Sequence, residues 1–561
     1  MASMSKSQFE ILSQSGGKSR WDLIEVLDER KAASARAEEL WVSKRFSGLK
    51  VVKESYDSVT RSYNSLEIFS RGASRKVSKY DESGKVAPCL SPDQLYLPAG
   101  RSSIRELLSQ SLDEWNLTPT ELLHSLDHYN RLNDSGTRLQ NAVQRAAIAQ
   151  SDGSSVQERM RHLYRVIDQT VAIAKQTAKD LPSLESGRLK PLIKAFGEEK
   201  NRGFMLSIAV TQYLRPAVTL EDKFGRVVAL LNAKHPRWVI SALDQFLAEF
   251  LAMKKLLPAL FGPQKDRRAF MVLLTEFQAG CLDVKRKSMG IHQLMPDLLR
   301  LDVFLGEDRL PLTREALLER LREEISSSAP VCDGDLADKL MGLKEINQII
   351  TRVDLDSATR EALKEALNDR SSRMVNSQSI GEFLQGFKFP DAKVRGLINV
   401  VNSSIGKTAQ RTAGNFIVPV LDTPDNEAWF LAIGSNPVER LKLLSAIGKE
   451  VENSLLLDMH KRHVITQLDK FSRIIAKKTN LLKKVLSVED DVFAKVERLL
   501  SMMADGYFPL GSVHNEAEQK VRSLMSHPDF MYALATGFGQ PNAADALRDF
   551  RAKLVLAGIS E

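Results

Sequence analysis

The hydrophobic pattern near the start of the chain changes from strand-like to helix-like spacing. Residues 21–28, WDLIEVLD, form a short apolar run of strand length, and residues 29–45 then place Ala33, Ala37, Leu40 and Trp41 on one helical face. The runs GLKVVKESY and YNSLEIF follow, with a polar turn between them that predicts a hairpin. The pattern therefore predicts a small β-α-β-β module at residues 20–71, preceded by a disordered tail at residues 1–19.

Periodicity disappears from residue 72 to residue 100, where Gly, Ser, Lys and Pro accumulate. This composition is typical of a flexible linker. Beyond it, helix-start signals recur: the pairs Ser103/Glu106, Thr118/Glu121 and Ser154/Gln157 each match the capping box. We expect two helical domains, at residues 101–326 and 327–561.

The helical segments predicted beyond residue 100 are amphipathic. Residues 238–261 carry the densest apolar face, so they are predicted to form the spine of the first helical domain. No repeat of fixed length is recognisable, which favours an irregular multi-helix array or bundles over a regular solenoid. The fold class expected is therefore predominantly α.

One segment interrupts the helical pattern. The apolar runs 416–421 and 429–433 stand on either side of the polar sequence DTPDNEA. Short apolar runs around a turn predict a β-hairpin, here inserted near residues 415–434. Pro419 would place its strand at a sheet edge, where a missing N–H does no harm.

The tripeptide Gly406-Lys407-Thr408 resembles the end of a phosphate-binding loop, G-x-x-x-x-G-K-[ST]. The first glycine of that loop makes a tight turn, but Val401 stands at this position, and a β-branched side chain resists positive φ. Lys407 and Thr408 are nevertheless the candidate nucleotide-binding residues. Residues 396–436 are the candidate centre of a nucleotide-dependent enzyme, the alternative function; no cofactor is expected otherwise.

Two histidine pairs raise the question of a metal site. His124 and His128 have the i, i+4 spacing of paired zinc ligands, but Ser125 replaces the glutamate of H-E-x-x-H and no third ligand is identifiable. We expect both to be ordinary helix histidines. His124 and His128 are the candidate ligands for the alternative, a metal site. His460 and His463 flank two cations, which oppose metal binding. The three cysteines are far apart, which favours a reducing compartment over a disulfide framework.

The strongest charge pattern lies between His460 and Val485. This basic segment contains eight cations against Asp469 alone, while Val464, Leu468, Phe471 and Ile475 form an apolar helical stripe. Three interpretations remain open: a solvated helix, a contact with an acidic protein partner or another copy, and a contact with nucleic acid or lipid. The candidate partner-binding residues are Lys461, Arg462, Lys470, Arg473, Lys477, Lys478, Lys483 and Lys484.

Composition narrows the function classes. The chain of 561 residues is 43% hydrophobic and 27% charged, with a formal net charge of +8. Nucleic acid is disfavoured, because the basic excess is local and no stacking aromatics alternate with it. No secretory signal, membrane-spanning run, nucleophile elbow or dinucleotide fingerprint is found. We expect a non-enzymatic cytoplasmic scaffold or regulatory protein-interaction protein, with self-association through the acidic residues 313–370 as one form of assembly.

Overall fold

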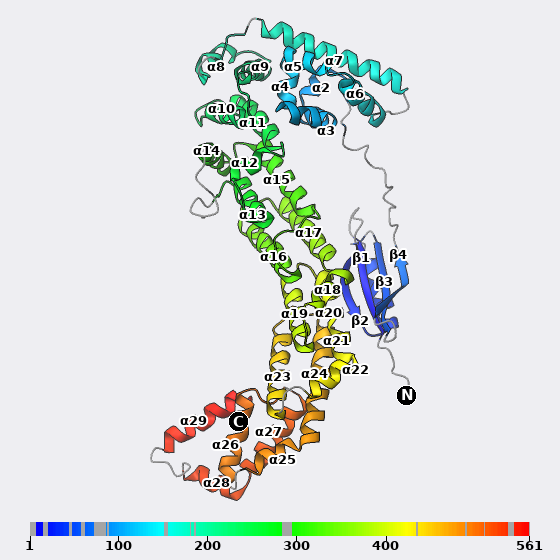
Figure 1. Ribbon diagram of the computed structural model, residues 1–561, viewed down its shortest axis with the longest axis vertical. Helices are drawn as coiled ribbons and strands as arrows, with labels where there is room; N and C mark the ends of the chain where they lie inside the picture. The colour runs from blue at the N-terminus through cyan, green and yellow to red at the C-terminus, as the bar shows by residue number, and fades with distance from the viewer. Residues whose placement is uncertain are drawn as a thin grey trace. The chain divides into compact units, whose positions relative to one another are not determined.

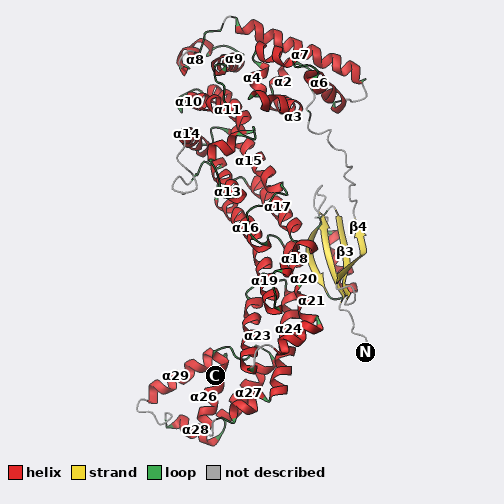
Figure 2. Ribbon diagram, viewed as in Figure 1, coloured by secondary structure: helices red, strands yellow, loops and turns green. Residues whose placement is uncertain are grey.

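The structure is a computed structural model, and its described residues fall into two compact units. The first unit contains residues 1–74, 333–344 and 368–561, and the second contains residues 75–332 and 345–367. Strands are confined to the N-terminal module in the part of the chain that is described (Figures 1 and 2). The described residues are 7–14, 21–43, 46, 48–57, 62–71, 86, 89–150, 155–179, 181–184, 187–282, 294–432, 436–488, 491–509, 511–536 and 543–559.

The N-terminal module of the first unit is a four-stranded antiparallel sheet with one helix. The strand order is β2-β1-β3-β4, so the first strand of the chain lies inside the sheet. Its core joins Phe9 and Ile11 of β1 to Ala33 and Ala37 of α1, because alternate strand residues face the helix. The elements are β1 Ser7–Gln14, β2 Asp22–Leu27, α1 Arg30–Val42, β3 Gly48–Asp57 and β4 Ser62–Arg71.

The prediction of a disordered tail was wrong for β1, whereas the other strands and the helix of the module were confirmed. Glu10 of β1 is a charged residue that is only 1% exposed. Its side chain lies on the sheet face opposite α1 and forms an ion pair with Arg411 of α20. A buried carboxylate needs such a partner, and a sequence does not reveal which residue supplies it.

The rest of the first unit is helical. Its largest hydrophobic core extends from residue 336 to residue 559 and includes Phe430, Phe471 and Phe530. The helices are α18 Ser377–Gln385, α19 Pro390–Ser403, α20 Lys407–Asn415, α21 Ile417–Asp422, α22 Pro424–Ala432, α23 Pro437–Glu452, α24 Asp458–Thr479, α25 Leu481–Leu486, α26 Val492–Ala504, α27 Ser512–Met525, α28 Pro528–Ala535 and α29 Ala543–Leu556.

The predicted β-hairpin near residues 415–434 was wrong, because the segment forms the short helices α21 and α22. Pro419 lies in the first turn of α21, where its missing N–H would have had no intrahelical partner. Pro424 starts α22, and Asp425 and Glu427 follow in its first turn, where they complement the helix dipole. The supposed turn is therefore a helix start.

The second unit is helical throughout its described part. The expected spine was confirmed as buried, although it forms two helices, α11 and α12, instead of one. The helices are α2 Pro92–Tyr96, α3 Pro98–Trp115, α4 Pro119–Leu123, α5 Leu126–Asn133, α6 Arg138–Ala149, α7 Val156–Ala178, α8 Lys190–Phe196, α9 Arg202–Leu214, α10 Leu220–Leu230, α11 Arg237–Leu251, α12 Leu256–Phe261, α13 Arg267–Gln278, α14 Met295–Gly306 and α15 Pro311–Ser326. The helices α16 Leu336–Arg352 and α17 Ser357–Met374 contribute residues to both units.

The structure revises two predicted boundaries. Helix α2 and the start of α3 lie inside the linker expected at residues 72–100. Most of residues 72–88 lie outside the described part of the chain. The capping box at Thr118 and Glu121 was confirmed, whereas Ser103 lies inside α3 and starts no helix. Within the described residues, no helix has the length and apolar character needed to cross a bilayer.

Candidate partner-binding surface

Helix α24 carries most of the basic segment and is oriented by its apolar stripe. Val464, Leu468, Phe471 and Ile475 are all at most 2% exposed. The ring of Phe471 stacks on Phe430 of α22, with the two centroids 5.6 Å apart. Burying four such side chains fixes the rotation of the helix, so the basic residues between them face away from the core.

The basic segment is divided into two helices at Asn480. This residue adopts the left-handed conformation, with φ 49° and ψ 44°, and its N–H donates to the carbonyls of Ala476 and Lys477. Asn is one of the few residues that tolerate this conformation at a helix end. Helix α25 begins at the next residue, so Lys483 and Lys484 lie on a different helix from Lys477.

Some of the predicted partner-binding cations already have partners within the chain. The Lys470 ammonium lies 3.0 Å from a carboxylate oxygen of Glu427 on α22. Arg473 pairs with Asp469 at 3.7 Å, and Lys461 donates to the carbonyl oxygen of Glu452 at 2.8 Å. Lys470 and Lys461 therefore join α24 to α22 and α23, whereas the Arg473 pair lies within α24 itself.

Four lysines at the end of the basic segment are in a different situation. Lys477, Lys478, Lys483 and Lys484, which we call the lysine cluster, are all exposed. No ion pair to any of them is recorded within the described residues. Arg462, at the other end of α24, is exposed as well. The lysine cluster is thus a concentration of positive charge that the described part of the chain does not neutralise.

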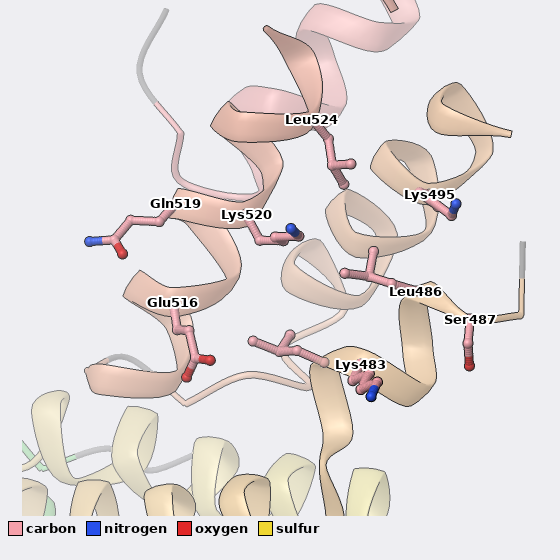
Figure 3. A pocket seen from close by; sticks show the side chains of 9 residues that line it. Lys483, Leu486, Ser487, Lys495, Glu516, Gln519, Lys520 and Leu524 are labelled. Atoms are coloured by element: carbon pink, nitrogen blue, oxygen red, sulfur yellow. The ribbon is translucent and has the colours of Figure 1, made fainter. Parts of the chain in front are cut away.

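A groove adjoins the lysine cluster between α25, α26 and α27. Its volume is about 660 Å³. The sequence patterns did not predict this groove, because its lining residues come from three separate segments of the chain. Leu486, Leu524 and Lys520 point into the space between α25 and α27 (Figure 3). The residues that line the groove include Leu482, Lys483, Leu486, Lys495, Lys520 and Leu524. We call this site the leucine–lysine groove.

The candidate nucleotide-binding residues lie at the start of α20. Lys407 is exposed and Thr408 is partly buried, and Gly406 before them has φ 84°. Val401 is buried inside α19, so a helix stands where a phosphate-binding loop requires a strand and a glycine turn. The backbone ahead of Lys407 therefore differs from that of a phosphate-binding loop.

His124 and His128 do not share a helix, because α4 ends at Leu123 and α5 begins at Leu126. His124 is the C-cap residue of α4, and its ring Nδ1 is 2.7 Å from the carbonyl oxygen of Thr120. Burial lowers the pKa of both histidines to about 4. No group of three or more metal-ligating side chains is gathered anywhere in the described part of the chain.

His460 is a buried member of α24. Its Nε2 lies 2.8 Å from the side-chain oxygen of Asn415 on α20, and its ring packs directly against Gly414. Burial, followed by the positive charge of Arg411, lowers the pKa of His460 to about 3. The ring is therefore neutral at pH 7 and belongs to the core, whereas His463 faces Asp422 at 3.3 Å.

Comparisons with known protein families, with curated proteins and with solved structures found no match. Only the charge, burial and geometry of the chain's own residues therefore bear on its function.

Proposed function

We propose that this chain is a non-enzymatic interaction protein that binds an acidic surface of a protein partner through the lysine cluster. The observation that carries the proposal is the exposure of Lys477, Lys478, Lys483 and Lys484 without an internal acidic partner in the described residues. Like charges held close together repel one another, so a surface of this kind gains free energy when an acidic surface covers it.

The rigid support of α24 favours this proposal over a merely solvated helix. The buried stripe and the Phe471–Phe430 stack hold α24 in one orientation, and buried Leu481 and Val485 anchor α25. The lysines on both helices are therefore presented without a further ordering of the backbone. An acidic protein surface is also favoured over nucleic acid, because the buried Phe471 is not available for base stacking.

The magnitude of the charge contribution is modest. Exposed ion pairs contribute roughly 0.2–1 kcal/mol each, so four of them give about 1–4 kcal/mol. Such a contact guides association and selects partners by charge, and added salt weakens it. Tight binding therefore needs an additional apolar contact close to the lysines.

The test compares two sets of charge reversals. The basic-face variant carries Lys477→Glu, Lys478→Glu and Lys484→Glu. The matched control carries the same change of net charge at exposed lysines of the second unit, namely Lys194, Lys200 and Lys254. Proteins that co-purify with the wild type and with the control at low salt should be lost from the basic-face variant. Sedimentation velocity of the same three proteins tests whether the partner is a second copy.

Equal capture by all three proteins would refute the proposal. Helicity must stay unchanged in the variants, because exposed charges contribute little to folding stability. The nucleotide alternative is tested in parallel: ATP or GTP should not raise the melting temperature of the wild type. A rise that Lys407→Ala abolishes would favour the enzyme instead.

A further inference from the structure

The leucine–lysine groove has two chemically different parts. Leu482, Leu486 and Leu524 are partly buried and pack against the main core of the first unit, so they form an apolar floor. The charged residues of the wall are three lysines against one glutamate, Glu516. An apolar floor with a basic wall is complementary to an amphipathic helix that has leucines on one face and carboxylates beside them.

The dimensions of the groove agree with such a helix. The lining residues of α27 extend from Glu516 to Leu524, which is roughly 12 Å along the helix at 1.5 Å per residue. Two turns of a bound helix have about the same length and present anchors at i, i+3 or i+4, and i+7. The groove is also open to solvent on one side, whereas pockets for small molecules enclose most of their ligand.

Positive charge extends beyond the groove. Lys483 belongs to both the groove and the lysine cluster, so positive charge continues from the groove to Lys477 and Lys478 on α24. A ligand confined to the groove would leave this charge uncovered. A helix with acidic residues beyond its apolar anchors would cover both surfaces.

We infer that the leucine–lysine groove is the docking site for an acidic amphipathic helix of a protein partner. The inference rests on the proposed function, which it deepens by naming the recognised element. Leucine-like side chains of the bound helix lie on Leu482, Leu486 and Leu524, and its carboxylates pair with Lys483 and Lys520. The apolar contact supplies affinity, and the lysines set the orientation.

The probe is a synthetic peptide of about 18 residues, long enough to form a helix, with leucines at i, i+4 and i+7 and glutamates beside them. A second peptide of the same composition has its leucines spread around the helix. Binding to the full chain is measured by fluorescence anisotropy at two salt concentrations. The groove variants are Lys483→Glu/Lys520→Glu and, separately, Leu524→Gln. The charge-matched control outside the groove and the lysine cluster is Lys194→Glu/Lys200→Glu, at exposed lysines of the second unit.

The amphipathic peptide should bind at least about tenfold more tightly than the rearranged one, because loss of one anchor is worth about tenfold. Leu524→Gln should abolish this preference, and Lys483→Glu/Lys520→Glu should weaken binding more than the control pair does. Leu524 is only partly buried, and the exposed lysine pair provides a second variant that leaves the core intact. Circular dichroism confirms folding.

Three outcomes overturn the inference. Equal binding of both peptides, with loss only in the lysine variants, refutes the groove and leaves the proposed function standing. If neither peptide binds, and the basic-face variant captures the same proteins as the wild type in the co-purification test, both the inference and the proposed function are refuted. Lysine-dependent binding to phosphatidylserine vesicles, with no binding of the amphipathic peptide, assigns the surface to lipid instead.

Discussion

The burial of His460 predicts a specific loss of stability in mild acid. Its pKa is lowered to about 3 in the folded chain, mainly by burial and then by the charge of Arg411. In the unfolded chain a histidine has a pKa of about 6.5. Below that value the unfolded state takes up a proton that the folded state refuses, so the free energy of unfolding falls as pH falls from about 6.5 towards 3.

The magnitude follows from the two pKa values. Between pH 7.5 and pH 5.0 the loss is about 2 kcal/mol, since each pH unit below the unfolded pKa costs about 1.4 kcal/mol. The charged groups that act on the ring are Arg411 of α20, which pairs with Glu10 of β1, and His463, which faces Asp422. Because they remain in place in the variant below, comparing the variant with the wild type isolates the imidazole.

The assay is hydrogen exchange of peptides from α24, corrected for the intrinsic effect of pH, which gives the free energy of opening of this core. His460→Gln should remove about 2 kcal/mol of the difference between pH 7.5 and pH 5.0. Phe471→Leu destabilises the same core without changing any titrating group, so it should keep the pH dependence of the wild type. If His460→Gln also keeps that dependence, the reasoning from burial is refuted.

Two further substitutions test the packing of each unit. Gly414→Ala should lower the melting temperature of the first unit, because the added Cβ would lie 2.3 Å from Nδ1 of His460. We expect a cost of about 1–3 kcal/mol in folding stability. Gly448→Ala is the control and should change little, because no atom would lie closer than 3.7 Å to its added Cβ. The Glu121 carboxylate is 1% exposed and lies 2.7 Å from the Lys223 ammonium. Lys223→Met leaves this carboxylate without its cation, so it should destabilise the second unit by about 3–5 kcal/mol in thermal denaturation. The double variant Lys223→Met/Glu121→Gln, in which both side chains are neutral, should recover part of the lost stability.

The sequence predicted elements well where one local rule dominates. The stripe of α24 was found from its spacing, and Thr118 was found as a helix start from its capping box. The apolar runs around residue 424 were assigned to strands, because a short apolar run fits a strand and a buried helical turn equally well. There the competing signal was Pro424 at the first helical position, with acidic residues after it.

The candidate site was predictable only in part. Charge counting located the basic segment, but it did not separate Lys470, which pairs with Glu427, from the lysine cluster, which has no ion pair among the described residues. The leucine–lysine groove depends on the packing of α25, α26 and α27, whose contributions are far apart in sequence. Local spacing carries no information on such contacts, and the same reason hid the Glu10–Arg411 pair.

The position of β1 inside the sheet has a consequence for shortened versions of this chain. A version that begins at residue 20, where the local pattern places the start of the module, loses the strand that hydrogen bonds to both β2 and β3. The inner edges of β2 and β3 then carry unpaired N–H and C=O groups, and the core around Ala33 and Ala37 loses Phe9 and Ile11. Exposed strand edges pair readily with other chains. We expect the shortened protein to aggregate through this module.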